Sequence, residues 1–367
     1  MAPARLKCPA CGREYPLSKL VWRCECGSPL RVDFPFVFEP LPRVRGMWRY
    51  RKSLPLAEAA QPVTLGEGGT ATVKAEVFGL KVFFKLEFLN PTGSFKDRGS
   101  SLTVSNLKAI GATEIAVDSS GNAGASIAAY SSLAGIKCRV YTPASAPQGK
   151  KAQIRIYGAE LIEVEGSRGD VTRRALSELR GAFYASHLWS PFFPEANATI
   201  AYEFFEDYGV PDAVIAPVGS GGLLLGLAWG FERLFKHGFS NLMPRVYAVQ
   251  SASNPTLHEA LYGRPFGRIE DEVLADGIAV QNPPRLGEIV EVLKKFKGGL
   301  SIVNNKDIIW GLKTLAKMGL FVEPTSATII PALRSLVESG DLASGESVLA
   351  PLTGFGFKAF EKIMARV

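Results

Sequence analysis

The sequence predicts an α/β protein whose parallel sheets are covered by helices on both faces. The first observation is that strand-length apolar runs alternate with helix-like stretches through most of the chain. The second is the composition: 367 residues, 47% hydrophobic and 21% charged, allow two globular domains of ordinary size. No apolar run reaches the ~20 residues that cross a bilayer, and the N-terminus lacks the apolar centre of a signal peptide. We therefore expect a cytoplasmic protein without membrane contact.

The expected elements follow one another from residue 63 to the end of the chain. Strands are expected at 82–88, 115–118, 139–142, 161–165, 183–186, 213–217, 246–250 and 348–351. Helices are expected at 101–110, 123–133, 148–157, 170–179, 198–208, 223–235, 306–317 and 326–337. Residues 33–62 contain five prolines, so we expect an extended linker there.

Four cysteines near the N-terminus have the spacing of a metal site. Cys8 and Cys11 form a C-x-x-C pair, and Cys24 and Cys26 form a C-x-C pair after a further twelve residues. Four thiolates can bind Zn²⁺ tetrahedrally and stabilise a segment that is too small for a core of its own. We therefore expect residues 1–32 to form a zinc-ribbon-like segment. The alternative is a pair of loops that bind no metal.

The positive charge of the chain is concentrated at its N-terminus. Residues 1–52 carry eleven Lys and Arg against four acidic residues, so they account for the whole formal charge of +7. With the four cysteines, this charge raises the alternative of a zinc-ribbon nucleic-acid-binding protein. No repeated basic helix accompanies the charge, however. We expect a solvated basic surface and no nucleic-acid partner.

The stretch N-P-T-G-S-F-K-D-R-G at 90–99 connects the expected strand at 82–88 to the expected helix at 101–110. It predicts a tight turn in which Ser94 caps the helix and Lys96 lies in the first helical turn. A cation is disfavoured there because the positive end of the helix dipole is close. Covalent engagement of the amine with a carbonyl compound, as in a Schiff base, would explain such a Lys. The alternative is a solvated Lys in an ordinary turn.

Three further loops follow expected strands, where α/β proteins place their sites. S-S-G-N-A-G at 119–124 has backbone N–H groups and hydroxyls that suit a carboxylate, and G-S-G-G-L at 219–223 suits a phosphate group. The third loop, L-T-G-F-G at 352–356, places the hydroxyl of Thr353 after the last strand. Each loop alone is also compatible with an ordinary turn or cap.

Together, these motifs resemble those of the β-family of pyridoxal phosphate enzymes. These enzymes have fold type II and are also called the tryptophan synthase β-like family. Within that family, N-P-T-G-S-F-K-D-R-G, S-S-G-N-A-G, E-P-T-S-A and L-T-G-F-G-F-K resemble the threonine synthases. The resemblance covers roughly residues 45–365. It implies two parallel-sheet domains within 63–367, with a smaller domain of about 90–190 inserted in a larger one. It further implies a homodimeric lyase that acts on a small amino-acid substrate.

The resemblance also implies a role for each site residue. Lys96 would be the catalytic residue, binding pyridoxal 5'-phosphate and then moving protons, while Phe95 packs on the ring and Asn122 binds the 3′ oxygen. The cofactor-binding residues would be Phe95, Lys96, Asn122, Gly219, Ser220, Gly221, Gly222, Leu223 and Thr353. The substrate carboxylate would be held by Ser119, Ser120, Gly121, Asn122 and Ala123. The reaction implied is the conversion of O-phosphohomoserine and water into threonine and phosphate.

The sequence departs from threonine synthases at two places. Where these enzymes often carry N-P-Y-R, an Asn and an Arg that meet the substrate phosphate are replaced by Ser190 and Phe193. The glycine loop at 219–223 is nearer that of the amino-acid dehydratases. The alternative function is therefore a serine/threonine dehydratase or a related β-elimination or replacement enzyme. Candidate phosphate ligands are Lys150, Lys151 and Arg155, which are otherwise solvated helix charges, and the three histidines (His187, His237 and His258) are expected to be structural.

Overall fold

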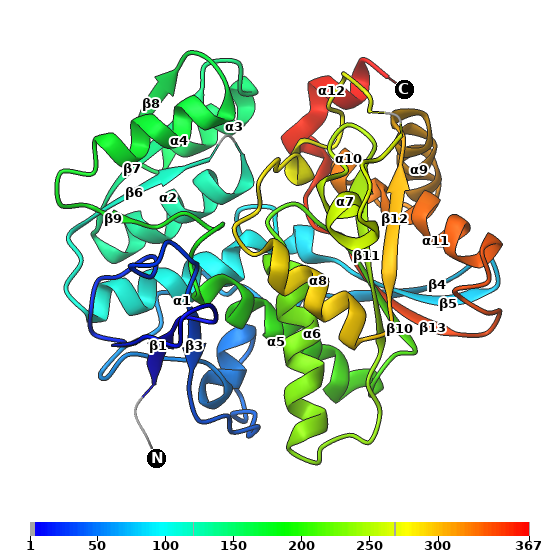
Figure 1. Cartoon of the computed structure of the whole chain (residues 1–367), viewed down its shortest axis with the longest axis horizontal. Coiled ribbons are helices and arrows are strands. Elements are labelled where there is room, and N and C mark those ends of the chain that lie inside the picture. Colours follow the sequence, from blue (N-terminus) through cyan, green and yellow to red (C-terminus); the bar gives the residue numbers. More distant parts are fainter. Residues whose placement is uncertain (1–3, 120, 268, 367) are drawn as a thin grey trace. The chain divides into compact units, whose positions relative to one another are not determined.

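The computed structural model describes residues 4–119, 121–267 and 269–366, and the chain forms two compact units (Figure 1). The N-terminal unit comprises Met1–Gly69 and Asn90–Asn197, and the C-terminal unit comprises Thr70–Leu89 and Ala198–Val367. Each unit contains a parallel sheet with helices, so the fold class predicted from the sequence is confirmed. None of the helices in the described part of the chain has the length and apolar character that a membrane crossing requires.

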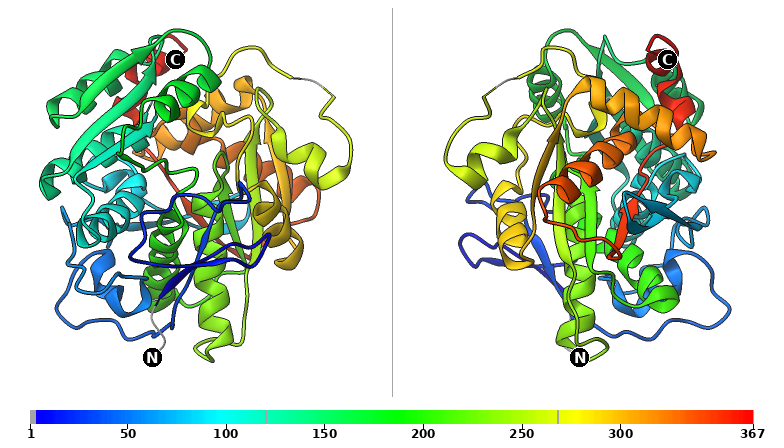
Figure 2. Two further views of the ribbon diagram at one scale, coloured as in Figure 1. Left: turned by 60° about the vertical axis from the view of Figure 1, so that its left-hand side comes forward. Right: turned by 90° about the vertical axis from the view of Figure 1, so that its right-hand side faces the viewer.

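The main sheet of the N-terminal unit has four parallel strands in the order β8-β7-β6-β9. The strands are β6 (Glu114–Asp118), β7 (Lys137–Pro143), β8 (Glu160–Val164) and β9 (Phe183–Tyr184), and the helices are α1 (Lys96–Ala109), α2 (Asn122–Ala134), α3 (Gln148–Ile156) and α4 (Arg168–Ser177). Alternate residues of β6 point to opposite faces. Ile115 therefore packs in the cluster that includes α2 and α3, and Ala116 packs in the cluster that includes α4. Helices lie on both sides of these strands (Figure 2).

The N-terminal segment forms a small antiparallel sheet in the order β2-β1-β3, with strands β1 (Arg5–Lys7), β2 (Glu14–Pro16) and β3 (Arg31–Asp33). Residues 33–62, expected as an extended linker, contain the 3-10 helix η1 (Met47–Ser53). Trp48 of η1 is buried, and its Nε1 donates hydrogen bonds to Glu67 Oε1 and Ser101 Oγ. One apolar cluster includes Trp48, Leu6 of β1 and Leu102 of α1, so this stretch packs tightly within the unit.

The C-terminal unit has a six-stranded sheet in the order β12-β11-β10-β13-β5-β4, and only β4 is antiparallel to its neighbour. The strands are β4 (Thr72–Val77), β5 (Leu80–Lys85), β10 (Ala213–Pro217), β11 (Arg245–Ser251), β12 (Gly299–Val303) and β13 (Ser347–Pro351). Central strand β10 is buried along its whole length because helices cover both of its faces. One face packs with α9 (Asn305–Lys317) and α11 (Ile329–Glu338), while α6 (Gly222–Lys236) and α8 (Leu286–Lys295) also contact the central strands.

Two strands of this sheet are absent from the elements expected from the sequence. Half of the residues of edge strand β4 are exposed. The strand is joined to β5 by a two-residue turn in which Phe78 and Gly79 both have positive φ, the backbone of a type I′ hairpin. Strand β12 forms the opposite edge. The expected strand at 82–88 ends early, at Lys85, and is followed by η2 (Glu87–Leu89). The remaining elements are α5 (Phe192–Tyr208), α7 (Thr256–Tyr262), η3 (Asp276–Ile278), α10 (Pro324–Ala327), η4 (Gly356–Ala359) and α12 (Phe360–Met364).

Candidate active site

The predicted site residues fall into two groups, one in each unit. The N-terminal unit contains Phe95, Lys96, Ser119, Gly121, Asn122 and Ala123. The C-terminal unit contains Gly219, Ser220, Gly221, Gly222, Leu223 and Thr353. Ser120, also predicted to hold the substrate carboxylate, lies outside the described residues.

Lys96 is the first residue of α1, and its Nζ lies 4.2 Å from the centroid of the Phe95 ring. The predicted cap by Ser94 is wrong: the helix begins one residue later than that cap requires, and Phe95 is the N-cap, without a side-chain hydrogen bond. Ser94 is fully buried, and within the described structure its Oγ makes no hydrogen bond. The start of α1 therefore presents an amine and a buried hydroxyl where most helices present a cap.

The turn before α1 is fixed by the carboxylate of Asp97. Thr92 donates to it from both its backbone N (2.7 Å) and its Oγ1 (2.6 Å). Ser126 of α2 donates to Asp97 Oδ1 at 2.6 Å. Because three donors from two elements bind one buried carboxylate, Lys96 is held in a defined position relative to α2.

The loop before α2 is organised by Ser119. Its Oγ accepts hydrogen bonds from Gly124 N at 2.9 Å and Gly121 N at 3.4 Å. The Ser119 side chain thus binds the backbone of its own loop, which the sequence reasoning did not anticipate. The N–H group of Ala123, in the first turn of α2, has no helical acceptor and is available to a carboxylate.

Two residues that the sequence reasoning did not assign to the site act on each other beside Lys96. Burial and the neighbouring cations Lys96 and Arg168 hold the pKa of His187 well below its ordinary value, so its ring is neutral near pH 7. The buried Nδ1 of His187 makes no hydrogen bond within the described structure. Arg168 is the first residue of α4 and donates from Nη2 to the carbonyl oxygen of Asp118 at 2.6 Å. Neither residue lies in a sequence motif that would indicate a place in the site.

The two positions that depart from the N-P-Y-R motif are occupied by packed side chains. Ser190 Oγ lies 3.0 Å from Thr103 Oγ1 of α1, so this hydroxyl joins two elements. Phe193 lies against α1 at Gly99, where any side chain would overlap its ring, and its ring centroid is 5.9 Å from that of His187. Neither residue supplies a cation.

Of the three candidate phosphate ligands on α3, two are engaged elsewhere. Lys151 Nζ pairs with Glu163 Oε2 at 2.8 Å, and Arg155 pairs with Glu163 Oε1 at 2.6 Å. Lys151 is also buried, so it is not a solvated helix charge. Lys150 is buried as well, and its Nζ would lie 3.6 Å from a Cβ placed on Gly121. Lys150 therefore extends over the loop that precedes α2.

In the C-terminal unit, the glycine loop forms the start of α6. Gly221 is the N-cap with φ +83°, and a Cβ there would overlap the side chain of Ile289. A Cβ on Gly219 would lie 2.9 Å from the Cα of Ile278. The first turn of α6 contains no acidic residue, and its N–H groups have no helical acceptors. Such a loop fits a phosphate group, because the absence of side chains lets the anion approach the backbone.

Thr353 is connected to this loop through the E-P-T-S-A motif. Ser326 Oγ lies 3.0 Å from Thr353 Oγ1 and accepts hydrogen bonds from the backbone N of Thr353 (2.9 Å) and Gly354 (3.1 Å). The adjacent Thr325 Oγ1 accepts from Gly277 N at 3.1 Å, and Gly277 lies beside Gly219. The C-terminal unit thus brings the glycine loop and Thr353 together. Ser326 belongs to the E-P-T-S-A motif, but no role was predicted for it from the sequence.

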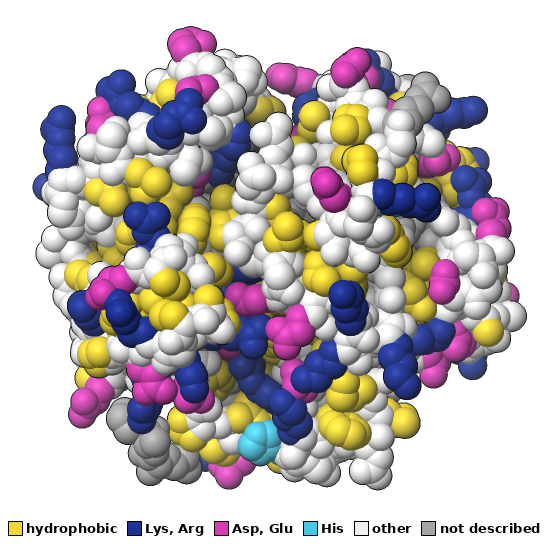
Figure 3. Space-filling view, in the orientation of Figure 1, with side chains coloured by type: hydrophobic (Ala, Val, Ile, Leu, Met, Phe, Trp, Pro, Cys, Tyr) yellow, Lys and Arg dark blue, Asp and Glu magenta, His cyan; other side chains and the backbone are white. Residues whose placement is uncertain are grey.

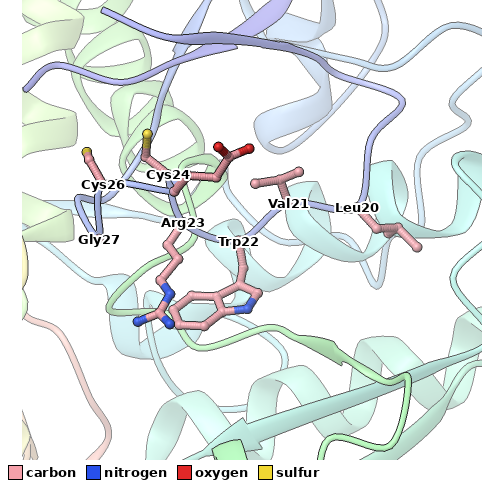
Figure 4. Close-up of a pocket in the computed structure, with 8 residues that line it drawn as sticks. Leu20, Val21, Trp22, Arg23, Cys24, Cys26 and Gly27 are labelled. Atoms are coloured by element: carbon pink, nitrogen blue, oxygen red, sulfur yellow. The ribbon is translucent and has the colours of Figure 1, made fainter. Parts of the chain in front are cut away.

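The four N-terminal cysteines converge, with all their sulfur atoms within 4.8 Å of one another. A tetrahedral Zn²⁺ with Zn–S bonds of about 2.3 Å requires sulfur atoms about 3.8 Å apart, and the Cys8–Cys26 and Cys11–Cys24 pairs are each at 3.5 Å. Cys24 and Cys26 project away from Trp22 and Arg23 in a surface pocket of about 460 Å³ (Figure 4). The Trp22 ring packs edge-on against Trp189, with centroids 5.2 Å apart.

The basic N-terminal segment is partly neutralised by ion pairs. Three of its four acidic residues pair with bases: Glu14 with Arg5, Glu25 with Arg13, and Glu39 with Lys52. On the face shown in Figure 3, Lys and Arg side chains are interspersed with Asp and Glu. On this face the distribution does not favour a nucleic-acid surface, which requires clustered positive charge.

Comparisons with known proteins give a consistent result. Residues 63–354 match the family described as pyridoxal-phosphate dependent enzyme. The chain is 33% identical to the threonine synthase of Methanocaldococcus jannaschii, over 96% of this chain and 92% of that protein. It is 31% identical to the threonine synthase of Methanosarcina acetivorans, over 95% and 91% of the two chains. Its fold resembles that of a pyridoxal 5'-phosphate-dependent aspartate racemase, with a TM-score of 0.68, 25% identity, and coverage of 78% and 90%.

Proposed function

The chain belongs to the pyridoxal-phosphate dependent enzymes and, within them, to the threonine synthase family, and we propose that it converts O-phosphohomoserine and water into threonine and phosphate. The observation that carries this assignment is the similarity to threonine synthases over 96% of the chain, which extends beyond residues 63–354. The local geometry of Lys96 supports it, because an amine at a helix start is suited to covalent engagement.

We propose that the cofactor is bound by Lys96 and by the glycine loop at the start of α6. The fit is supported by the close approach of Ile278 and Ile289 to Gly219 and Gly221, which leaves no space for side chains there. Thr353 would meet the ring nitrogen with a hydroxyl that Ser326 orients. A neutral hydroxyl leaves that nitrogen without a full charge. When bound, pyridoxal phosphate supplies the electron sink for removing substrate protons and expelling phosphate.

The residues of the chain would then position the substrate and move its protons. The Ala123 N–H and the neighbouring loop would hold the substrate carboxylate at the start of α2. The Lys96 amine would remove the proton from Cα and then one from Cβ, phosphate would leave from Cγ, and the two protons would be returned to Cγ and, after the addition of water, to Cα. Water would add at Cβ. Phe95 would pack on the cofactor ring, and Asn122 would bind its 3′ oxygen.

Product analysis of the purified holoenzyme tests the assignment. With O-phosphohomoserine we expect threonine and phosphate in equal amounts, and no product from Lys96→Ala. A serine/threonine dehydratase would instead form 2-oxobutanoate from threonine. If only that product appears, the threonine synthase assignment is wrong, although the cofactor assignment is unaffected.

We also propose that Cys8, Cys11, Cys24 and Cys26 bind one structural Zn²⁺. The converging sulfur atoms support this, and zinc would fix residues 1–32, which are too short for a core of their own. Elemental analysis should find one zinc per chain in the wild type and in Cys138→Ala, but less in Cys24→Ser. If Cys24→Ser contained as much zinc per chain as the wild type, the proposed zinc site would be wrong.

We propose that the enzyme works as a cytoplasmic homodimer, with residues 1–32 as the zinc segment, 33–62 as a connecting segment, and 63–367 as the catalytic region, including an inserted domain of about 90–190. The family resemblance supports this arrangement. Light scattering of the purified protein should give twice the chain mass of 39.6 kDa. A monomer that is fully active would reject the dimer.

A further inference from the structure

A substrate phosphate needs charge-assisted donors, and a guanidinium is the side chain best matched to it. The chain lacks that group at the position where threonine synthases often carry Arg, because Phe193 stands there and packs on Gly99. Ser190, at the Asn position, is engaged with Thr103 of α1. If O-phosphohomoserine is the substrate, as proposed above, a cation must come from another element.

Arg168 approaches the same neighbourhood from α4. Its Nη2 donates to the carbonyl oxygen of Asp118 at 2.6 Å, and Asp118 directly precedes the loop proposed to hold the substrate. Arg168 and Lys96 both act electrostatically on His187, whose ring lies 5.9 Å from that of Phe193. Arg168 and Phe193 thus both have His187 as a neighbour.

Asp118 orients the guanidinium of Arg168 but does not accept hydrogen bonds from all of its N–H groups. The Asp118 carboxylate accepts hydrogen bonds from Tyr184 OH at 2.7 Å and Thr172 Oγ1 at 2.6 Å. Arg168 Nη2 is 3.3 Å from the same carboxylate, a longer contact. The Nη1 of Arg168 is buried and makes no hydrogen bond within the described structure. The Arg168 side chain as a whole is 36% exposed, but this buried N–H group is a donor that a bound anion would satisfy.

A second cation lies at the same loop. Lys150 is 3% exposed, and its Nζ would lie 3.6 Å from a Cβ on Gly121, the N-cap of α2. Arg168 thus contacts the loop where it begins, and Lys150 lies over its middle. A group with two negative charges beside this loop would meet a guanidinium and an ammonium.

We propose that Arg168, assisted by Lys150, binds the phosphate group of the phosphorylated amino-acid substrate and replaces the Arg that the motif lacks. This inference rests on the proposed function. It makes Arg168 a specificity-determining residue, since a substrate without phosphate gains nothing from it.

The test compares Arg168→Met with the wild type, both as holoenzymes. We expect the KM for O-phosphohomoserine and the inhibition constant of inorganic phosphate each to rise about 10- to 100-fold. The affinity for L-threonine, which has no phosphate, should change less than about twofold when followed by the cofactor's absorption. Arg168→Lys, which retains a positive charge, should show a smaller rise. Arg174→Met is the matched control, because Arg174 is on the same helix, exposed, and paired with Glu178.

If Arg168→Met leaves both the KM for O-phosphohomoserine and the inhibition constant of inorganic phosphate unchanged, the proposal is overturned. An equal loss of affinity for threonine would also overturn it, since Arg168 would then only support the loop through Asp118. If Arg168→Met does not fold, Arg168→Lys provides the test. A wild-type KM for O-phosphohomoserine together with an unchanged inhibition constant of phosphate in Arg168→Lys would show that Arg168 does not bind the substrate phosphate. If the wild type forms no threonine, the proposed function fails, whereas calorimetric titration of inorganic phosphate still tests Arg168 as an anion ligand.

Discussion

The starts of helices α4 and α9 differ from those of α1 and α6. At α4, Ser167 Oγ accepts from Asp170 N while the Asp170 carboxylate accepts from Ser167 N, which is a complete capping box. At α9, Asn304 Oδ1 accepts from Asp307 N at 2.9 Å. The N-caps of α1 and α6 are Phe95 and Gly221, and neither makes a side-chain cap hydrogen bond.

This difference shows that stability and function make opposite demands on a helix start. A capping side chain satisfies the first N–H groups and stabilises the helix by about 1 kcal/mol. A helix start that must accept a phosphate group leaves those N–H groups open. The comparison therefore predicts that substitutions at α6 change cofactor binding, whereas substitutions at α9 change stability alone.

The largest effect is expected from Gly221→Ala. The substitution forces a side chain into a left-handed backbone and against Ile289, at a cost of about 2–4 kcal/mol. We expect the apparent cofactor affinity, measured by titrating the apoenzyme and following fluorescence, to fall at least tenfold. Gly238→Ala is the control, since Gly238 follows α6 with a similar φ and nothing within 4 Å. Equal cofactor affinity in the two variants would contradict a phosphate cup at Gly221.

An intermediate effect is expected from Ser326→Ala. The change removes the acceptor for the backbone N of Thr353 and Gly354 and the partner of Thr353 Oγ1, which costs about 1–3 kcal/mol. We expect weaker cofactor binding and a shifted absorption band, because the Thr353 hydroxyl is no longer oriented. Ser335→Ala, at an exposed position of α11, should leave both unchanged. An unaltered absorption spectrum in Ser326→Ala would contradict a contact between the Thr353 hydroxyl and the cofactor.

The smallest effect is expected from Asn304→Ala. Loss of this cap should lower the free energy of unfolding by about 1 kcal/mol, as measured by urea denaturation. The kinetic constants should stay at wild-type values, because α9 contributes no residue to the proposed site. Asn304→Asp preserves an acceptor and should restore stability. A change in KM would mean that capped helices also influence the site.

The sequence predicted the buried parts of the fold better than its edges. Central strand β10 is an uninterrupted apolar run that is buried on both faces, so its pattern is unambiguous. Edge strand β4 has exposed polar residues and a Phe-Gly turn, and neither feature resembles a typical strand or hairpin signal. The helix at Lys96 was expected, but its start was not, because Ser94 is buried instead of capping it.

The candidate site could be predicted only where a local motif carried it. The loops at Lys96 and Gly219 have recognisable sequence and adopt the expected strand-loop-helix settings. The contacts of Ser326 with Thr353 and of Arg168 with Asp118 join residues 27 and 50 positions apart, so no local pattern reports them. Conversely, Lys151 and Arg155 looked available in the sequence but are paired with Glu163.

The most direct test of the account is to locate the covalent bond to the cofactor. The holoenzyme is reduced with borohydride, digested, and analysed by peptide mass spectrometry. We expect a phosphopyridoxyl group on the peptide that contains Lys96, and none in Lys96→Ala. A modification on another lysine, or an unmodified Lys96 in protein that has bound the cofactor, would contradict it.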